Sequence, residues 1–460
     1  MDAFFAAVEQ AAKPSLRGKP VIVGGLGPRG VVATCSYEAR VFGVHSAMPT
    51  SQARRLCPNA AYLQPRFEVY RSISERVMAL LGELSPLVEP LSLDEAFVDL
   101  EAGGAARDTA GARSVAERLR ADIRAATGLT GSVGLAGSKM LAKMASELAK
   151  PDGFFVVTPG TEPALLAPMS VRALPGVGPA TAETLRRAGI TTVKQVTEAG
   201  EEELVQLLGR AHGSWVHAMG LGRDRRPVVA ERDAKSVSVE DTFDVDLHDR
   251  VRIRAEVARL AERCVSRLRG ARRSGRTVVL KVRRYDFSTL TRSETLRGPT
   301  DDPVVVREAA ERLLEGVDTT GGVRLLGVGV SGLADYTQED LFAQAAGERA
   351  ARAAEQEARE IAAVRDTGGP QAGREPGGES GGGEPPGAAG VPEAPEPRRW
   401  PPGVDVVHTG HGPGWVQGSG LGRVTVRFET PLSPPGRVLT FAADDPALER
   451  GKPLPLVPQD

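Results

Sequence analysis

Residues 91–100, Leu-Ser-Leu-Asp-Glu-Ala-Phe-Val-Asp-Leu, place two adjacent carboxylates between short apolar runs. Neighbouring residues of a regular strand point to opposite faces. Asp94 and Glu95 can therefore act on one target only if the backbone bends there, as at a hairpin tip or a bulge. Two nearby carboxylates also repel each other and resist ionising together unless a cation neutralises them. The pair predicts a site for a hard divalent ion such as Mg²⁺, which takes carboxylate and phosphate oxygens; a solvated surface turn is the alternative.

The segment 31–60 carries a pair of side chains suited to phosphate. Tyr37 and Arg40 are three residues apart, so they share one face if the segment is helical. Arginine offers a planar fork of hydrogen-bond donors that matches phosphate oxygens, and tyrosine offers a hydroxyl on a rigid ring. The pair therefore indicates contact with a phosphate group.

Residues 132–153 predict a strand, a turn and then a helix that ends before Pro151. Within them, Lys139, Lys143 and Lys150 are separated by four and seven residues, a spacing that places the three side chains on one helical face. This face is either a solvated basic surface or a clamp for a triphosphate or a nucleic-acid backbone. The whole chain has only nine lysines, and three of them in one stretch favour the clamp.

Four stretches resemble, in order and in rough spacing, the Y family of translesion DNA polymerases, in particular its bacterial DNA polymerase IV branch. They are MDAFFAAVEQ (1–10), SYEARVFGVHSAMP (36–49), PLSLDEAFVDL (90–100) and GLAGSKMLAKMASELAKPDG (134–153). The resemblance covers about residues 1–340. It implies DNA-templated nucleotidyl transfer in an open site, with two Mg²⁺ ions as cofactors. The partners that it implies are primer-template DNA, a dNTP and the sliding clamp.

The same resemblance implies a multidomain α/β (α+β) fold, the right hand of polymerases. It would combine a ferredoxin-like palm, fingers, a helix-hairpin-helix thumb and a DNA-binding little finger, with a small C-terminal β domain added. The expected boundaries are 1–6 and 68–158 for the palm, 7–67 for the fingers, 159–225 for the thumb, 226–235 for a linker, 236–335 for the little finger, 336–342 for a clamp-binding peptide, 343–399 for a helical and then disordered linker, and 400–460 for the β domain.

The matching motifs imply functional roles for residues of this chain. Asp94 would bind metal, and Glu95 would be the second carboxylate of the catalytic centre. The ring of Phe5 would be the steric gate that excludes a ribose 2′-hydroxyl. The incoming triphosphate would be held by Tyr37, Arg40 and Lys150.

The N-terminal motif departs from the family pattern. The family opens with an apolar strand ending in Asp-x-Asp-x-Phe-Phe, whose first Asp is a metal ligand, whereas this sequence begins Met1-Asp2-Ala3-Phe4-Phe5. Met1, through its backbone carbonyl, and Asp2 remain as further candidate ligands. Because every other functional position is intact, we expect the coding start to lie upstream of Met1; a catalytically impaired protein is the alternative. We then expect the chain to extend primers at least about a hundredfold more slowly than a version begun upstream.

Charge is strongly segregated along a chain whose formal net charge is only −1. Residues 250–297 contain 15 Lys or Arg and 4 Asp or Glu, a net of +11. They predict a helix at 251–270 and a strand at 277–287 that includes Arg283 and Arg284. One-sided charge of this size favours a polyanion over a solvated surface. We therefore expect these two arginines to contact the DNA backbone.

Residues 174–190, LPGVGPATAETLRRAGI, predict a tight hairpin followed by a helix that starts near Pro179 or Ala180. Gly176 and Gly178 free the backbone, and helix-start amides can then approach phosphate closely. The motif resembles a helix-hairpin-helix, which grips duplex backbone without reading bases; a generic helix-turn-helix connection is the alternative. Such contacts position DNA without specifying its sequence, as a polymerase requires.

Three features follow the expected little finger. Gln338, Leu341 and Phe342 lie in a pentapeptide that resembles the Gln-x-x-Leu-Phe peptides by which bacterial polymerases dock on the sliding clamp; the start of an amphipathic helix is the alternative. Residues 367–396 contain 10 Gly and 6 Pro and predict a disordered linker. Residues 400–448 predict short strands broken by Gly and Pro turns, and so a small antiparallel barrel or sheet.

Composition narrows the class of protein. Three cysteines without CxxC spacing indicate neither a disulfide framework nor a zinc site. No signal-peptide pattern and no apolar run of about 18 residues is present, so we expect neither export nor membrane insertion. The resemblance to the Y family implies an error-prone translesion DNA polymerase, a cytoplasmic bacterial monomer that works at replication forks. The alternatives are a catalytically impaired scaffold that binds DNA and the clamp, and a subunit of a larger mutagenic polymerase complex.

Overall fold

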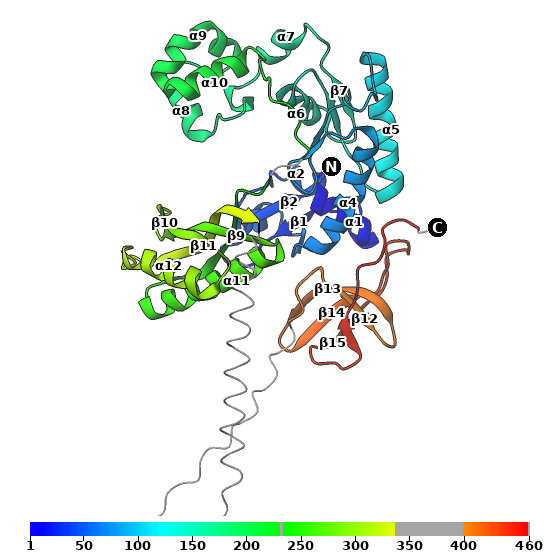
Figure 1. Cartoon of the computed structure of the whole chain (residues 1–460). Coiled ribbons are helices and arrows are strands. Elements are labelled where there is room, and N and C mark those ends of the chain that lie inside the picture. Colours follow the sequence, from blue (N-terminus) through cyan, green and yellow to red (C-terminus); the bar gives the residue numbers. More distant parts are fainter. Residues whose placement is uncertain (231–232, 336–398, 459–460) are drawn as a thin grey trace, which may run out of the picture. The chain divides into compact units, whose positions relative to one another are not determined.

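The structure of the chain is a computed structural model that describes residues 1–230, 233–335 and 399–458. The chain forms two compact units, Met1–Arg232 together with Pro397–Asp460, and Asp233–Glu396 (Figure 1). The expected clamp-binding residues Gln338, Leu341 and Phe342, and the expected linker after them, lie outside the described residues. No helix within the described ranges has the length and apolar character that a membrane span needs.

The first unit begins with a small mixed sheet. Its central strand β1 (Val21–Gly24) pairs antiparallel with β2 (Val32–Cys35) and parallel with β3 (Ala61–Leu63). All four residues of β1 are buried, as expected for a short apolar run at the centre of a sheet. The apolar face of α1 (Phe4–Ala12) packs into the same core as β1. The connecting elements are η1 (Pro14–Leu16), α2 (Tyr37–Arg40) and α3 (Thr50–Leu56).

Two long helices support the strands that carry the carboxylate pair. α4 (Phe67–Leu84) and α5 (Thr109–Thr127) face each other through apolar stripes with a spacing of four residues, Val77 and Leu81 on α4 and Leu119 and Ile123 on α5. β4 (Val88–Pro90) and β5 (Ala96–Val98) form an antiparallel hairpin. β6 (Val133–Leu135) pairs parallel with β7 (Phe154–Val156) through α6 (Lys139–Leu148). The strand, turn and helix predicted for residues 132–153 are confirmed.

Short helices with a common core follow. Their bounds are α7 (Glu162–Leu166), η2 (Val171–Ala173), α8 (Pro179–Arg187), α9 (Val193–Leu208) and α10 (Arg210–Gly220). The core includes Leu174, Leu185 and Leu204. α8 begins at Pro179, as predicted, because proline lacks the amide that a first helical turn leaves unused.

The described part of the second unit, residues 233–335, is an antiparallel sheet with two helices packed on one face (green and yellow in Figure 1). The strand order is β10-β9-β11-β8, with β8 (Ser236–Leu247), β9 (Arg273–Arg284), β10 (Thr289–Thr300) and β11 (Val323–Asp335). The helices are α11 (Arg250–Gly270) and α12 (Pro303–Glu315). The predicted helix at 251–270 is confirmed. The strand predicted at 277–287 is present as β9, in which Val278, Leu280 and Val282 alternate into the core beneath the helices, but it starts earlier, at Arg273, and ends at Arg284, with residues 285–287 in the following turn.

Residues 399–458 fold into a five-stranded antiparallel sheet that belongs to the first unit. Its order is β15-β14-β13-β12-β16, with β12 (Asp405–His408), β13 (Gly412–Gly420), β14 (Arg423–Arg427), β15 (Val438–Ala442) and β16 (Leu448–Arg450). A core of its own includes Trp400, Val416 and Val426. The small antiparallel β domain predicted from the Gly and Pro turns is confirmed.

Candidate active site

Asp94 and Glu95 lie in the turn between β4 and β5, where the backbone leaves strand geometry. The carbonyl oxygen of Glu95 closes the turn by accepting hydrogen bonds from the amides of Leu91 (2.8 Å) and Ser92 (3.3 Å). The Ser92 hydroxyl donates to a carboxylate oxygen of Asp94 at 2.8 Å. The predicted bend at the carboxylate pair is therefore confirmed, and Ser92 restrains the Asp94 side chain.

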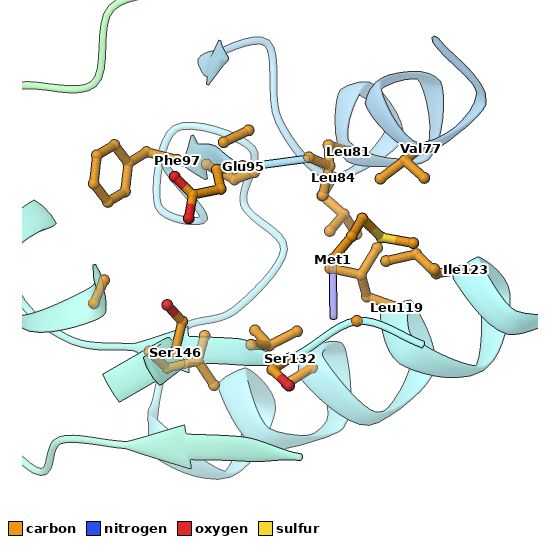
Figure 2. Close-up of a pocket in the computed structure, with 18 of the residues that line it drawn as sticks. Met1, Val77, Leu81, Leu84, Glu95, Phe97, Leu119, Ile123, Ser132 and Ser146 are labelled. Atoms are coloured by element: carbon orange, nitrogen blue, oxygen red, sulfur yellow. The ribbon is translucent and has the colours of Figure 1, made fainter. Parts of the chain in front are cut away.

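Both carboxylates line a cavity of about 170 Å³. Figure 2 shows Glu95 at one end of this cavity and apolar side chains of α4 and α5, such as Leu81 and Ile123, at the other. The side chain of Met1 lies among the apolar ones, and its amino group donates to the carbonyl oxygen of Asp94 at 2.7 Å. Glu95 is therefore separated from these apolar side chains of α4 and α5, and the end of the cavity that holds the carboxylates is its polar end.

Two lysines line the cavity beside the carboxylates. Lys143 of α6 forms an ion pair with Glu95 and also donates to Glu147 at 3.4 Å. Lys150 donates to the same oxygen of Glu147 at 2.7 Å. Burial would raise the pKa of the Glu147 carboxyl, but Lys150 and Lys143 together hold it below its usual value. Glu147 thus holds the ammonium groups of Lys143 and Lys150 at the cavity that the carboxylate pair lines, where they can bind a polyphosphate.

The prediction of one basic helical face is wrong for Lys150, and the expectation that this face is either solvated or a clamp is wrong for Lys139, although Lys139 lies in α6 with Lys143. α6 ends at Leu148, so Lys150 lies beyond the helix. Lys139 is buried, and its ammonium group donates to Glu89 at 2.5 Å and to the carbonyl oxygen of Pro227 at 3.0 Å. Lys139 is therefore committed to a buried ion pair with a residue 50 positions away, a contact that helical spacing does not reveal.

Tyr37 and Arg40 share one face of α2, as predicted. The guanidinium of Arg40 lies over the ring of Tyr37, 4.6 Å from its centroid. Burial, assisted by the charge of Asp2, raises the pKa of the Tyr37 hydroxyl. Among the described residues, this hydroxyl is a buried group without a hydrogen-bond partner. A protonated donor that is buried and unpaired calls for an explanation, and an anionic ligand would supply one.

Asp2 is buried, and both of its carboxylate oxygens are engaged. One accepts a hydrogen bond from the hydroxyl of Ser132 at 2.8 Å, and the other accepts from the amide of Asp152 at 2.9 Å. Asp2 is not among the residues that line the cavity with Asp94 and Glu95. Its side chain joins the first residues to the segments around β6 and β7, a structural role that occupies both oxygens.

The oxygen donors at the polar end of the cavity suit a hard divalent ion. Within the described ranges, no three His, Cys, Asp or Glu side chains come together as a metal-binding group. Mg²⁺ in nucleotide enzymes commonly takes one or two carboxylates and completes its shell with phosphate oxygens and water. Asp94 and Glu95 fit an ion of this kind, and Met1, whose backbone carbonyl is a further candidate donor, lines the same cavity.

Phe5 belongs to an aromatic cluster between α1 and α4. Its ring stacks on the buried ring of Tyr70, with centroids 4.3 Å apart and an interplanar angle of 11°. Phe67 meets Phe5 edge-on at 5.9 Å. Leu93, next to Asp94 in the sequence, packs against the same core. The sequence does not single out Tyr70, and its only local signal is its place in the first turn of an amphipathic helix.

The glycines of the predicted hairpin have the geometry that the motif requires. Gly176 has a φ of +83°, in the left-handed region that favours glycine. Gly178 is the N-cap residue of α8. Trp215 supports the hairpin from α10, because its indole donates to the carbonyl oxygen of Pro175 at 3.2 Å. Contact of this hairpin with DNA stays a prediction.

Arg283 and Arg284 lie at the end of β9 in the second unit and point to opposite faces of its sheet. Alternation from the buried Val282 places Arg284 on the side of the helices, where its Nε is buried. Arg283 lies on the open side with Lys281, and its Nε donates to the hydroxyl of Thr289 at 3.2 Å. Of these two arginines, Arg283 is therefore the one on the open face of the sheet, which a long polyanion could cover.

Comparison with known proteins agrees with this geometry. Residues 1–147 match the impB/mucB/samB family, and residues 234–341 match the C-terminal domain of that family. The DNA polymerase IV of Streptomyces coelicolor is 71% identical over 457 residues, which cover 99% of this chain and 90% of the relative. The chain belongs to the impB/mucB/samB family, the Y family of DNA polymerases. It is a DNA-directed DNA polymerase of the translesion type, and it uses divalent metal ions as Y-family polymerases do.

Other relatives and structures of the Y family agree. The DNA polymerase IV of Corynebacterium diphtheriae is 38% identical over 99% of this chain and 97% of the relative. That of Alkalilimnicola ehrlichii is 45% identical over 74% of this chain and 95% of the relative, so about a quarter of this chain has no counterpart there. A chimera of the Y-family polymerases Dbh and Dpo4 covers 73% of this chain and 98% of its own, at 25% identity and a TM-score of 0.67. An insertion ternary complex of Dbh DNA polymerase has a TM-score of 0.54 at the same identity and coverage. The right-hand α/β fold expected from the sequence is confirmed.

Proposed function

We propose that this polymerase adds dNMP units to a primer 3′-hydroxyl at a centre formed by Asp94 and Glu95 with two Mg²⁺ ions. The observation that carries the proposal is the cavity that gathers both carboxylates with Lys143 and Lys150. The substrates are primer-template DNA and a dNTP. The enzyme acts as a monomer in the bacterial cytoplasm, at replication forks where damaged templates stall synthesis.

The protein contributes charge and position to the reaction. Bound Mg²⁺ ions would supply Lewis acidity for the attacking and leaving oxygens. Asp94 and Glu95 provide the carboxylates for these ions, and the bond from Ser92 keeps the Asp94 carboxylate oriented. Lys143 balances the charge of Glu95 in the free enzyme. Preorganised charges of this kind carry most of the catalysis in phosphoryl-type transfers.

The triphosphate is held by Tyr37, Arg40 and Lys150, and the sugar is selected by Phe5. The unpaired hydroxyl of Tyr37 supports this assignment because a phosphate oxygen would satisfy it. The guanidinium of Arg40, stacked on the Tyr37 ring, presents a rigid fork to a second phosphate. Stacking on Tyr70 restricts the movement of the Phe5 ring, so the ring would clash with a ribose 2′-hydroxyl.

Replacement of Arg40 tests this assignment. Arg40→Ala is expected to raise the KM for dNTP about tenfold, because a hydrogen bond to a charged group contributes about 1.5–3 kcal/mol. Single-nucleotide incorporation on a primer-template measures it. Arg54→Ala is the matched control, since it removes another guanidinium that lies over a tyrosine ring, that of Tyr62 at 4.3 Å. An unchanged KM in Arg40→Ala would remove this residue from the triphosphate site.

The DNA backbone is held by the hairpin of Gly176 and Gly178 and by the open sheet face of the second unit. Arg283→Ala is expected to flatten the plot of log binding constant against log salt by about one unit, because one phosphate contact is lost. The measurement is fluorescence anisotropy of labelled duplex at several salt concentrations. Arg254→Ala is the control, since it removes a guanidinium from α11, near Glu311 and Glu315. Equal slopes for Arg283→Ala and the unmodified protein would show that this face does not meet DNA.

The sliding clamp is bound by Gln338, Leu341 and Phe342, in a segment outside the described residues. Replacement of Leu341 and Phe342 by Ala removes two apolar anchors and should weaken clamp binding by about 2 kcal/mol or more. Primer extension is measured with and without clamp. Extension without clamp should be unaffected, and stimulation by the clamp should be lost. If stimulation survives, another segment is the docking site.

A further inference from the structure

A buried cluster of charges joins the polymerase core to the C-terminal β domain, residues 399–458. Glu9 of α1 is fully buried and accepts hydrogen bonds from Lys13 and, at 2.9 Å, from Arg66. Arg66 lies directly before α4 and donates a second bond to Asp405 of β12 at 2.5 Å. A single guanidinium therefore bridges a carboxylate of the core and a carboxylate of the β domain.

The charges of this cluster balance only when the β domain contributes. The core supplies two cations, Lys13 and Arg66, and one carboxylate, Glu9. Asp405 is the second carboxylate. Burial and the neighbouring Arg66 lower the pKa of Lys13, while Glu9 and Asp405 oppose that shift. Because an unpaired buried charge is strongly unfavourable, Asp405 completes a cluster that the core alone leaves positive.

Tyr70 connects this cluster to Phe5. Its hydroxyl donates to the same oxygen of Glu9 that Arg66 binds, at 2.7 Å, and its ring stacks on Phe5. Burial, and then the charge of Glu9, raises the pKa of the hydroxyl, so it remains a donor. The surface that supports the Phe5 ring is thus fixed by a hydrogen-bonded chain that ends at Asp405.

A second set of contacts holds the β domain on the same part of the core. Glu429, only 6% exposed, accepts hydrogen bonds from the hydroxyl of Ser15 at 2.6 Å and from the indole of Trp415 at 2.9 Å. Arg17 donates to the carbonyl oxygen of Pro431 at 2.6 Å. Trp415 itself is buried in the core cluster that contains α1. The β domain is therefore packed against the core, and Asp405 has a fixed position from which to act.

We propose that Asp405 is a positioning residue for the Phe5 gate, and that the C-terminal β domain therefore contributes to the rejection of ribonucleotides. The connection runs through Arg66, Glu9 and Tyr70. This inference rests on the proposed gate function of Phe5. A steric gate selects only if its ring cannot give way, so the groups that lock its support decide how sharply it discriminates.

Asp405→Asn tests the proposal, because it keeps the shape of the side chain and removes its charge. Selectivity is the ratio of kcat/KM for dNTP to that for the matching rNTP, measured by single-nucleotide incorporation with the full chain. We expect selectivity to fall on the order of threefold to tenfold, as for coupled groups of one network. The fall should come from a lower KM for the rNTP, while kcat for the dNTP is retained. Glu449→Gln, the corresponding loss of charge at an exposed residue of β16, which pairs with β12, should leave selectivity unchanged.

Two further variants separate positioning from a general loosening of the fold. Tyr70→Phe keeps the ring and removes the hydroxyl that links it to Glu9. In this background Asp405→Asn should have little further effect, whereas independent effects would add. Arg66→Lys should reproduce Asp405→Asn, because an ammonium lacks the planar fork that bridges two carboxylates. If Asp405→Asn disturbs folding, the selectivity of Arg66→Lys tests the proposal in its place.

Phe5→Ala, measured in parallel, distinguishes the two proposals. If Phe5→Ala leaves selectivity unchanged, the gate function is contradicted and the role of Asp405 falls with it. If Phe5→Ala loses selectivity while Asp405→Asn and Arg66→Lys retain it, only the positioning role is overturned. Effects of Asp405→Asn and Tyr70→Phe that add would overturn it as well.

Discussion

Glu95→Gln is expected to slow primer extension by about a hundredfold to a thousandfold. The substitution keeps the size of the side chain but removes one of the two carboxylates at the polar end of the cavity. Loss of one preorganised electrostatic element costs roughly 3–4 kcal/mol in comparable sites, and each 1.36 kcal/mol is about tenfold in rate. Single-turnover extension of a bound primer, with saturating dNTP, measures the effect on the chemical step.

The control for this prediction is Glu101→Gln, which removes an exposed carboxylate from the same segment of the chain. Its extension rate should equal that of the unmodified protein. Binding of primer-template by Glu95→Gln should also be retained, because the expected DNA contacts lie elsewhere. If Glu95→Gln extends primers at the normal rate, the catalytic carboxylates are not those of the β4–β5 turn.

Phe5→Ala is expected to lower the selectivity for dNTP over rNTP on the order of a hundredfold, while dNTP incorporation continues. Overlap between a 2′-hydroxyl and a fixed ring costs about 3 kcal/mol at the upper end of values for overpacked sites. The Phe5 ring is held in place by stacking on Tyr70 and by the edge of Phe67. Competition between a dNTP and the matching rNTP for one primer terminus measures the ratio.

Phe155→Ala serves as the control for the loss of a large ring, since Phe155 is an exposed residue of β7. It should retain the selectivity of the unmodified protein. A Phe5→Ala enzyme that still rejects ribonucleotides would show that another group selects the sugar.

The parts of the site that have local signals were predictable from the sequence. Neighbouring residues of a strand point to opposite faces, so Asp94 and Glu95 can act on one target only where the backbone bends. The structure has this bend between β4 and β5. The start of α8 at Pro179 follows from the glycine-rich hairpin before it. The shared face of Tyr37 and Arg40 follows from helical spacing.

The parts that depend on distant partners were not predictable. Lys139 has the spacing of a ligand-binding residue, but Glu89 takes its charge in the folded protein. Arg66 and Asp405 are 339 residues apart, and nothing in either flanking sequence marks them as partners. The stacking of Tyr70 on Phe5 likewise depends on how α1 and α4 pack. Which of these groups are buried, and which of their charges are paired, depends on how the helices and sheets pack against one another.

The sequence also predicts the β domain at the C-terminus without indicating a role for it. Its strands follow from Gly and Pro turns, which are local, whereas its contacts with Ser15 and Arg17 involve the opposite end of the chain. From the sequence alone, Asp405 of this domain would be interpreted as a solvated surface charge, whereas in the structure it pairs with Arg66. Its place in a buried network is what connects the domain to the proposed selection of nucleotides.

We infer that one centre in this chain performs template-directed synthesis of DNA. The most direct test is incorporation of a single nucleotide by the purified chain on four primer-templates that differ only in the template base. We expect each template to direct addition of the complementary dNMP, one pyrophosphate to be released per nucleotide added, and Mg²⁺ to be required. Addition that ignores the template base, or a protein that binds every primer-template but extends none, would contradict it.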